Sequence, residues 1–243
     1  MNEKVNRPSL ILVHGAFHGP WVWDAVADRL VTQGWNVHAV KLPSVADQTA
    51  PSFGLHDDAG AIGRVLDTMC GPVVAVAHSY GGIPLTEAAA KSPKVSHLIY
   101  LAAFHIDVGE SLLSALGGRL ADWTRVDDDK LWIATPTDVF YADVEPEAAT
   151  LATNNLRRSS LASFEEQLAA APPPSVRSTY VICEQDRALP PELQRQMALR
   201  CDESRTLATG HSPMLSAPEE VVAIITDVAH GFTCAPQTLG KAH

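Results

Sequence analysis

Three residues that could together activate a hydroxyl for nucleophilic attack follow separate predicted strands of this chain. Ser79 follows the apolar run 73–77, Asp186 lies in the loop after the predicted strand 179–183, and His211 lies past the last predicted strand, 203–207. A serine hydroxyl is a weak nucleophile until a base takes its proton, so it needs a histidine that a third group orients. The order serine, acid, histidine is typical of one class of hydrolase, and it predicts that these three side chains form a catalytic triad.

Other carboxylates and simpler roles compete with this interpretation. Glu184 directly follows the predicted strand 179–183, which leaves it close to the strand body, whereas Asp107 follows the strand 97–103, where some hydrolases place the acid. The alternatives for the preferred residues are a surface-turn carboxylate at Asp186 and a capping loop histidine at His211.

The segment around Ser79 has the composition of a sharp strand-to-helix turn. Small residues stand two positions before and two positions after it, at Ala77 and Gly81, and a helical pattern begins at Ile83. Such a turn, a nucleophile elbow, holds the hydroxyl clear of the sheet and points the positive end of a helix at developing charge. The alternative is an ordinary turn in which Ser79 caps the helix.

Hydrolysis through a tetrahedral intermediate also needs two donors for the oxyanion. The backbone N–H of Tyr80, directly after the serine, is one candidate, and the N–H of Ala16 in the loop after the first predicted strand is the other. His14 is interpreted as a residue that supports this loop. His18 has two interpretations, a pocket-lining residue or a structural one, and we include it among the predicted substrate-binding residues.

Alternating apolar strands and amphipathic helices predict an α/β fold with a mostly parallel, doubly wound sheet of about six strands. The predicted strands are 9–13, 36–40, 73–77, 97–103, 179–183 and 203–207, and the predicted helices include 21–33, 55–69, 190–200 and 217–231. Residues 1–103 and 175–243 would form the core. Residues 104–174 show no second run of strands, so we expect a helical cap, with helices at 146–155 and 160–171, over the carboxyl ends of the strands.

Composition limits the partners. The net charge of −10 argues against nucleic acid or an anionic membrane, and no apolar run is long enough to span a bilayer. The four cysteines and the histidines lack metal-ligand spacing, so we expect free thiols, no metal and no cofactor. No signal segment is visible, which predicts a cytoplasmic protein. We expect a small-molecule substrate, and a homodimer is one option for the oligomeric state, which the sequence leaves open. The tail 232–243 has no period and is expected to be disordered.

Four motifs resemble the α/β-hydrolase fold superfamily, and within it the plant methylesterase and hydroxynitrile lyase group with its bacterial esterase relatives. They read LVHGAFHGPWVW, AHSYGG, CEQDRALP and GHSPMLSAPEEV. The resemblance implies Ser79, Asp186 and His211 as the triad, Ala16 and Tyr80 as oxyanion donors, and a lid over an apolar pocket. The lyases of the group carry a Thr where this chain has His14-Gly15 and a Lys where it has Ser212, so the sequence is more similar to the esterases.

The cap supplies aromatic residues that could contact a flat or apolar acyl group, with ordinary packing as the alternative role. We expect two or three of them to line the pocket: Trp132 first, then Trp123 and Phe140, with Tyr141 and Phe164 as further candidates. The sequence thus predicts a serine esterase for a small methyl or aryl ester. The alternatives are a carbamate, amide or lactone hydrolase, a cyanohydrin-type lyase, and a weakly catalytic ligand receptor.

Overall fold

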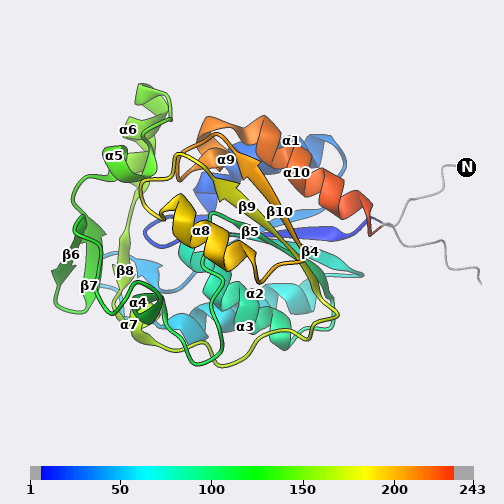
Figure 1. Cartoon of the computed structure of the whole chain (residues 1–243), viewed down its shortest axis with the longest axis horizontal. Helices are drawn as coiled ribbons and strands as arrows, with labels where there is room; N and C mark the ends of the chain where they lie inside the picture. Colours follow the sequence, from blue (N-terminus) through cyan, green and yellow to red (C-terminus); the bar gives the residue numbers. More distant parts are fainter. Residues whose placement is uncertain (1–6, 233–243) are drawn as a thin grey trace, which may run out of the picture.

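The computed structural model describes residues 7–232 and has a six-stranded parallel sheet at its centre (Figure 1). Its strand order is β10-β9-β5-β4-β1-β2, in which every neighbouring pair is parallel. The strands are β1 (Ser9–Val13), β2 (Val37–Val40), β4 (Val73–His78), β5 (Val95–Leu101), β9 (Arg177–Cys183) and β10 (Glu203–Leu207). Because β1 and β4 are buried on both faces, they read as continuous apolar runs. The predicted sheet is confirmed.

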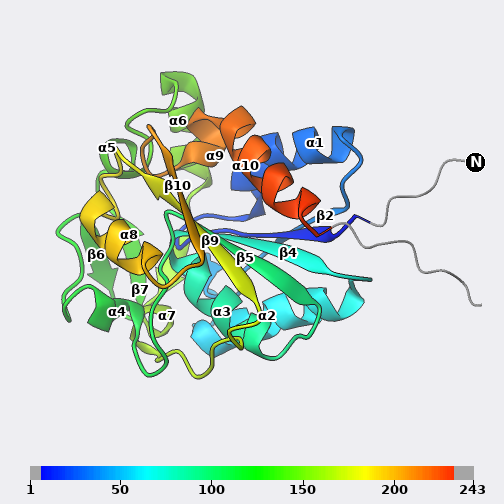
Figure 2. The same cartoon turned by 45° about the vertical axis from the view of Figure 1, so that its right-hand side comes forward.

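Helices cover both faces of the sheet (Figure 2). On one face lie α1 (Asp24–Thr32), which follows the 3₁₀ turn Pro20–Trp23, together with α9 (Pro213–Ser216) and α10 (Pro218–His230). On the other face lie α2 (Leu55–Thr68), α3 (Gly82–Ala90) and α8 (Pro191–Ala198). Each face therefore has its own apolar core, and both cores extend to the carboxyl ends of the strands.

Residues 104–174, which we call the cap, contain a second sheet that the sequence did not predict. The cap holds α4 (Leu112–Ala115), β6 (Thr124–Asp127), β7 (Lys130–Ile133), α5 (Pro136–Phe140), α6 (Pro146–Asn155), β8 (Arg158–Ser160) and α7 (Ala162–Glu165). Its antiparallel sheet has the order β3-β8-β7-β6, and β3 (Val45–Ala46) comes from the core part of the chain. The expectation of a cap without strands was wrong. Strands of two to four residues are too short to show a period-two pattern, so the sequence does not reveal them.

The predicted cap helices had different outcomes. The helix at 146–155 is present as α6, but only Ala162–Glu165 of the predicted helix 160–171 is helical. The reason is that the N–H groups of Leu168 and Ala169 donate to the Glu110 carbonyl and the Glu87 carboxylate instead of to carbonyls of their own helix. Cys234 and the tail 233–243 lie outside the described residues. Within residues 7–232, none of the helices has both the length and the apolar character of a membrane span.

Candidate active site

Ser79 stands where β4 turns sharply into a helix. The strand ends at His78, a 3₁₀ turn covers Ser79–Gly81, and α3 follows at once. Ser79 has a φ of 53°, a left-handed conformation that a residue with a side chain adopts only when its surroundings enforce it. A Cβ on Gly81 would lie 2.5 Å from the His14 carbonyl oxygen, so this position accepts only glycine. The turn thus has the geometry of the predicted elbow.

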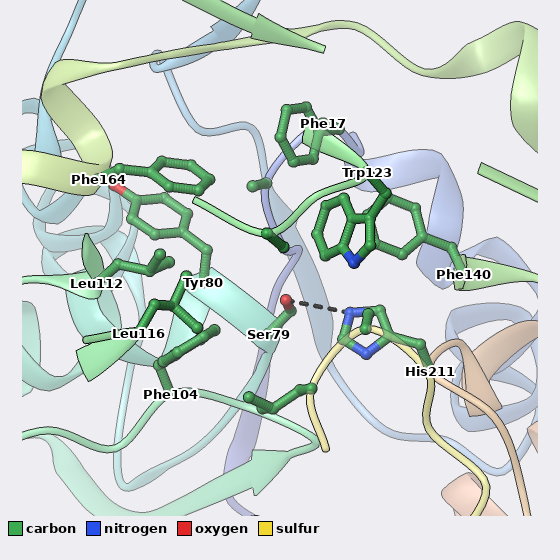
Figure 3. Close-up of a pocket in the computed structure, with 14 residues that line it drawn as sticks. Phe17, Ser79, Tyr80, Phe104, Leu112, Leu116, Trp123, Phe140, Phe164 and His211 are labelled. Atoms are coloured by element: carbon green, nitrogen blue, oxygen red, sulfur yellow. Dashed lines mark hydrogen bonds between the residues drawn. The ribbon is translucent and has the colours of Figure 1, made fainter. Parts of the chain in front are cut away.

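Ser79, His211 and Asp186 form one hydrogen-bonded series, and Figure 3 shows its bond between Ser79 and His211. The Ser79 Oγ lies 3.2 Å from Nε2 of His211, and Nδ1 of His211 lies 2.7 Å from Oδ2 of Asp186. The side chains of His211 and Asp186 are 2% and 0% exposed. Because the carboxylate can only accept, Nδ1 carries the proton and Nε2 is left as the acceptor for the serine hydroxyl. This is the arrangement that a general base requires.

Asp186 is held in place by three further donors besides His211. Its Oδ1 accepts from the N–H groups of Ala188 at 2.7 Å and Leu189 at 2.9 Å, and its Oδ2 accepts from Nε2 of Gln194 at 2.9 Å. Gln194 is fully buried on α8, and its own Oε1 accepts from the N–H of Cys183. The sequence reasoning missed Gln194. The available signal was the helical spacing of Gln194 and Met197 on α8, which puts the glutamine on the same buried face as the methionine.

The two competing carboxylates point away from this series. Glu184 pairs with Arg195 at the surface, and Asp107 pairs with Arg200 at 2.9 Å, with the Asp107 side chain 69% exposed. Neither has a hydrogen bond to His211. Position in the fold therefore separates Asp186 from both of them.

Ala16 and Tyr80, whose backbone amides are the predicted oxyanion donors, both line the pocket that contains Ser79. Tyr80 belongs to the first turn of the helical segment, where N–H groups have no partner within the helix, and Ala16 lines the same pocket as Ser79. A Cβ on Gly15 would lie 2.8 Å from the Ser79 Cβ, so Gly15 allows the Ala16 loop to approach the serine closely. The structure thus places both residues in the lining of the pocket that holds Ser79, and their role as oxyanion donors stays a prediction.

The pocket above Ser79 is lined almost entirely by apolar side chains. It encloses about 450 Å³, including its opening to solvent. The polar side-chain groups in its lining belong to Ser79, His211, the buried Tyr80 phenol and the indole N–H of Trp123, and no lining residue carries a fixed charge. The other lining residues are Ala16, Phe17, Phe104, Leu112, Leu116, Ala121, Trp123, Phe140, Phe164, Ala188 and Leu189. Such a lining suits an uncharged, apolar or aromatic ligand.

Comparison with known proteins assigns the fold to a family. Residues 10–224 match the model of the alpha/beta hydrolase family. The chain belongs to this family. Alpha/beta hydrolase nvfD of Aspergillus novofumigatus is 30% identical to it, over 92% of this chain and 97% of that protein. Methylesterase 7 of Arabidopsis thaliana is 26% identical over 95% and 99% of the two chains. The solved structure of a pyrethroid hydrolase from Sphingobium faniae JZ-2 superposes with a TM-score of 0.81 at 23% sequence identity. The match covers 92% of this chain and 97% of the hydrolase, and it shows that the two share a fold.

Three cap aromatics of this alpha/beta hydrolase face the pocket, but Trp132 does not. In Figure 3, Trp123 and Phe140 lie over His211, and Phe164 lies against the ring of Tyr80. Trp132 lies on β7 between the buried Leu131 and Ile133, so it points outward and is 41% exposed. The prediction of Trp132 as a pocket residue was wrong. On a strand, alternation turns it to the face opposite its neighbours.

Of the two interpretations of His18, the structure supports the structural one, so its inclusion among the predicted substrate-binding residues was wrong. It is buried beneath Phe140 and outside the pocket lining, with both ring nitrogens hydrogen-bonded to protein atoms. Burial lowers the pKa of His18 to about 3 and that of His14 to about 4. Both rings are therefore neutral near pH 7. Tyr141 is buried next to His18 and is likewise absent from the pocket lining.

His78, which the sequence reasoning passed over, supports the backbone of the base. Its Nε2–H donates to the carbonyl oxygen of His211 at 2.8 Å, and the two rings lie 4.6 Å apart. Burial holds the pKa of His78 well below its usual value, so a neutral ring fixes the loop that carries His211. A histidine directly before the serine was the available signal.

Proposed function

We propose that this alpha/beta hydrolase is a serine esterase that cleaves small carboxylic esters through an acyl-enzyme. The observation that carries the proposal is the hydrogen-bonded series Ser79–His211–Asp186 at the floor of an apolar pocket. A buried aspartate that orients a histidine, which in turn accepts from a serine, is the set of groups that acyl transfer requires. No other group in the pocket lining offers a base or a nucleophile.

In the proposed reaction, the Ser79 oxygen attacks the ester carbonyl while Nε2 of His211 takes the hydroxyl proton. The carbonyl oxygen becomes an oxyanion that accepts from the amides of Ala16 and Tyr80. The tetrahedral intermediate collapses, and the leaving alcohol receives the proton from His211. Water then attacks the acyl-serine with His211 again as base, which releases the carboxylic acid and restores the serine. The Asp186 carboxylate accepts from Nδ1–H of His211 and stabilises the imidazolium in both steps.

The pocket lining favours methyl or aryl esters with an apolar acyl group. Its aromatic residues offer flat faces, and the absence of a charged side chain disfavours anionic substrates. The relative from Arabidopsis thaliana is a methylesterase by name, and the structural neighbour from Sphingobium faniae is a pyrethroid hydrolase, which agrees with this class. A cyanohydrin-type lyase has less support, because the lining offers no cation to hold cyanide.

The test compares the wild-type protein with Ser79→Ala on a panel of methyl esters, aryl esters and carbamates. We expect the wild type to hydrolyse p-nitrophenyl acetate and to carry an acetyl group on the peptide that contains Ser79 when the reaction is quenched early. The variant should lose at least about 10³-fold in kcat, because no other group replaces the nucleophile. A variant that keeps its rate would refute the mechanism, and a wild type that binds esters without turnover would favour the ligand receptor.

A further inference from the structure

The loop that carries the predicted oxyanion donor Ala16 is fixed at successive peptide groups. The carbonyl oxygen of Gly15 accepts from Nδ1 of His14 at 2.8 Å. In a trans peptide the C=O and the following N–H point in opposite directions. The bond from His14 to the Gly15 oxygen therefore turns the N–H of Ala16 away from the His14 ring.

The peptide between Ala16 and Phe17 is held from both sides. Its carbonyl oxygen accepts from Nδ1 of His18 at 2.8 Å, and its N–H donates to Oγ of Ser159 at 2.8 Å. The carbonyl of Phe17 then accepts from the N–H of Arg157 at 2.9 Å. Phe17 has a φ of 65°, which a bulky side chain adopts only where surrounding contacts enforce it. These contacts maintain the strained turn beside Ala16.

The Ala16 carbonyl fixes the tautomer of His18, and Tyr141 stabilises that tautomer. The Ala16 carbonyl can only accept, so Nδ1 of His18 must be the N–H. Because burial keeps the His18 ring neutral, its Nε2 is then an acceptor, and it receives the Tyr141 hydroxyl at 2.9 Å. The Tyr141 hydroxyl thus stabilises the only tautomer that can bond to Ala16. Tyr141 and Ser159 both belong to the cap.

We propose that the cap positions the oxyanion amide of Ala16, through Tyr141 acting on His18 and through Ser159 acting on the Phe17 amide. The inference rests on the proposed esterase function and extends it. In this arrangement the cap does more than select the substrate, because it also sets the geometry in which charge is stabilised. Tyr141, His18 and Ser159 are positioning residues, since none of them lines the pocket.

The kinetic test removes one hydroxyl at a time. Tyr141→Phe and Ser159→Ala should each lower kcat about tenfold, less than the 10²–10³ that loss of a whole oxyanion donor costs, and leave KM nearly unchanged. The inhibition constant of an aryl trifluoromethyl ketone, whose serine adduct carries an oxyanion, should rise by the same factor. Tyr100→Phe and Ser160→Ala are the matched controls, because those hydroxyls bond to Thr86 and to the Phe53 carbonyl. The controls should keep wild-type kcat.

A second measurement reads the His18 ring directly and does not depend on turnover. In ¹⁵N-labelled wild type, the His18 nitrogens should show the neutral Nδ1–H form, and Tyr141→Phe should shift both His18 nitrogens and the Ala16 amide while Tyr100→Phe leaves them in place. An unchanged His18 spectrum and unchanged kcat in Tyr141→Phe and Ser159→Ala would overturn the inference. If the wild type hydrolyses no ester, the esterase proposal fails, and the ring measurement still decides whether the cap positions Ala16.

Discussion

The pocket has a core wall, which contains Ser79 and His211 with the supporting Asp186, and a cap wall, which contains Trp123, Phe140 and Phe164. Different interactions hold the two walls. On the core side, Asp186 accepts four hydrogen bonds and each reacting group has a defined partner. On the cap side, aromatic rings pack on one another: Trp123 meets Phe140 edge-on at 5.6 Å, and Phe164 stacks on Tyr80 at 6.0 Å. Hydrogen bonds fail when a single atom changes, whereas ring packing adapts. We therefore expect abrupt losses from substitutions in the core wall and graded changes from those in the cap wall.

The largest expected effect in this comparison comes from Asp186→Asn. The amide can present its NH₂ to Nδ1 of His211, which favours the tautomer that cannot accept the Ser79 proton. The kcat for p-nitrophenyl acetate should fall by about 10³–10⁴-fold, as expected for a triad that loses its acid, with the melting temperature little changed. Initial rates and a thermal melt of the same preparation measure both quantities.

Two isosteric controls sharpen this prediction. Glu184→Gln and Asp107→Asn alter carboxylates that pair with surface arginines, and both should keep the wild-type rate within about twofold, since surface ion pairs contribute little. If Asp107→Asn lost as much kcat as Asp186→Asn, the acid of the triad would be Asp107, which follows β5, and not Asp186.

Asp58 lies where the two walls meet, and we expect its contribution to the free energy of unfolding to depend on pH. Its Oδ2 accepts from the hydroxyls of Ser44 at 2.5 Å and Tyr80 at 2.7 Å, and its Oδ1 accepts from the Ser44 N–H at 2.9 Å. Ser44 adjoins β3, the core strand that pairs with the cap, and Tyr80 follows the nucleophile. Burial raises the pKa of Asp58 from 3.8 to about 6.

A raised carboxyl pKa means that the folded protein binds the Asp58 proton more tightly than the unfolded chain does. Between pH 3.8 and about 6 the folded state keeps the proton, so this residue makes the free energy of unfolding fall as pH rises. Relative to Asp58→Asn, which cannot titrate, the wild type should lose about 2–3 kcal/mol over that window. Urea unfolding of both proteins at a series of pH values measures the difference. A wild type that gained stability relative to Asp58→Asn as the pH rises would contradict the burial argument.

The core wall could be predicted from the sequence because its signals are local. The strands β1 and β4 are largely apolar runs, and Ser79, Asp186 and His211 each follow a strand that the sequence predicts. Their positions at one edge follow from the parallel order of the strands. The nucleophile elbow could be recognised from its small residues, since Gly81 has no room for a Cβ.

The cap wall could not be predicted in the same way, because its contacts join residues far apart in the chain. Phe17 and Ser159 are 142 positions apart, and His18 and Tyr141 are 123 apart. No local pattern indicates such a pair. The strand β7 has four residues, too few for its alternation to be distinguished from a helical pattern, so the sequence does not indicate that Trp132 faces away from the pocket.

The comparison of Trp123→Ala with Trp132→Ala tests the cap wall with the smallest expected effect. Both remove an indole from the cap, but only Trp123 lines the pocket. Trp123→Ala should raise the kcat/KM ratio of a bulky aryl ester over an acetyl ester about tenfold, which is the scale on which apolar pockets discriminate size. Trp132→Ala should leave that ratio unchanged, because its ring is 41% exposed on the opposite face of β7. Competition between the two esters in one reaction gives the ratio directly.

A changed ratio in Trp132→Ala alone would mean that substrate enters across the outer face of the cap sheet. An abrupt loss of all turnover in Trp123→Ala would mean that the cap wall, like the core wall, depends on single contacts.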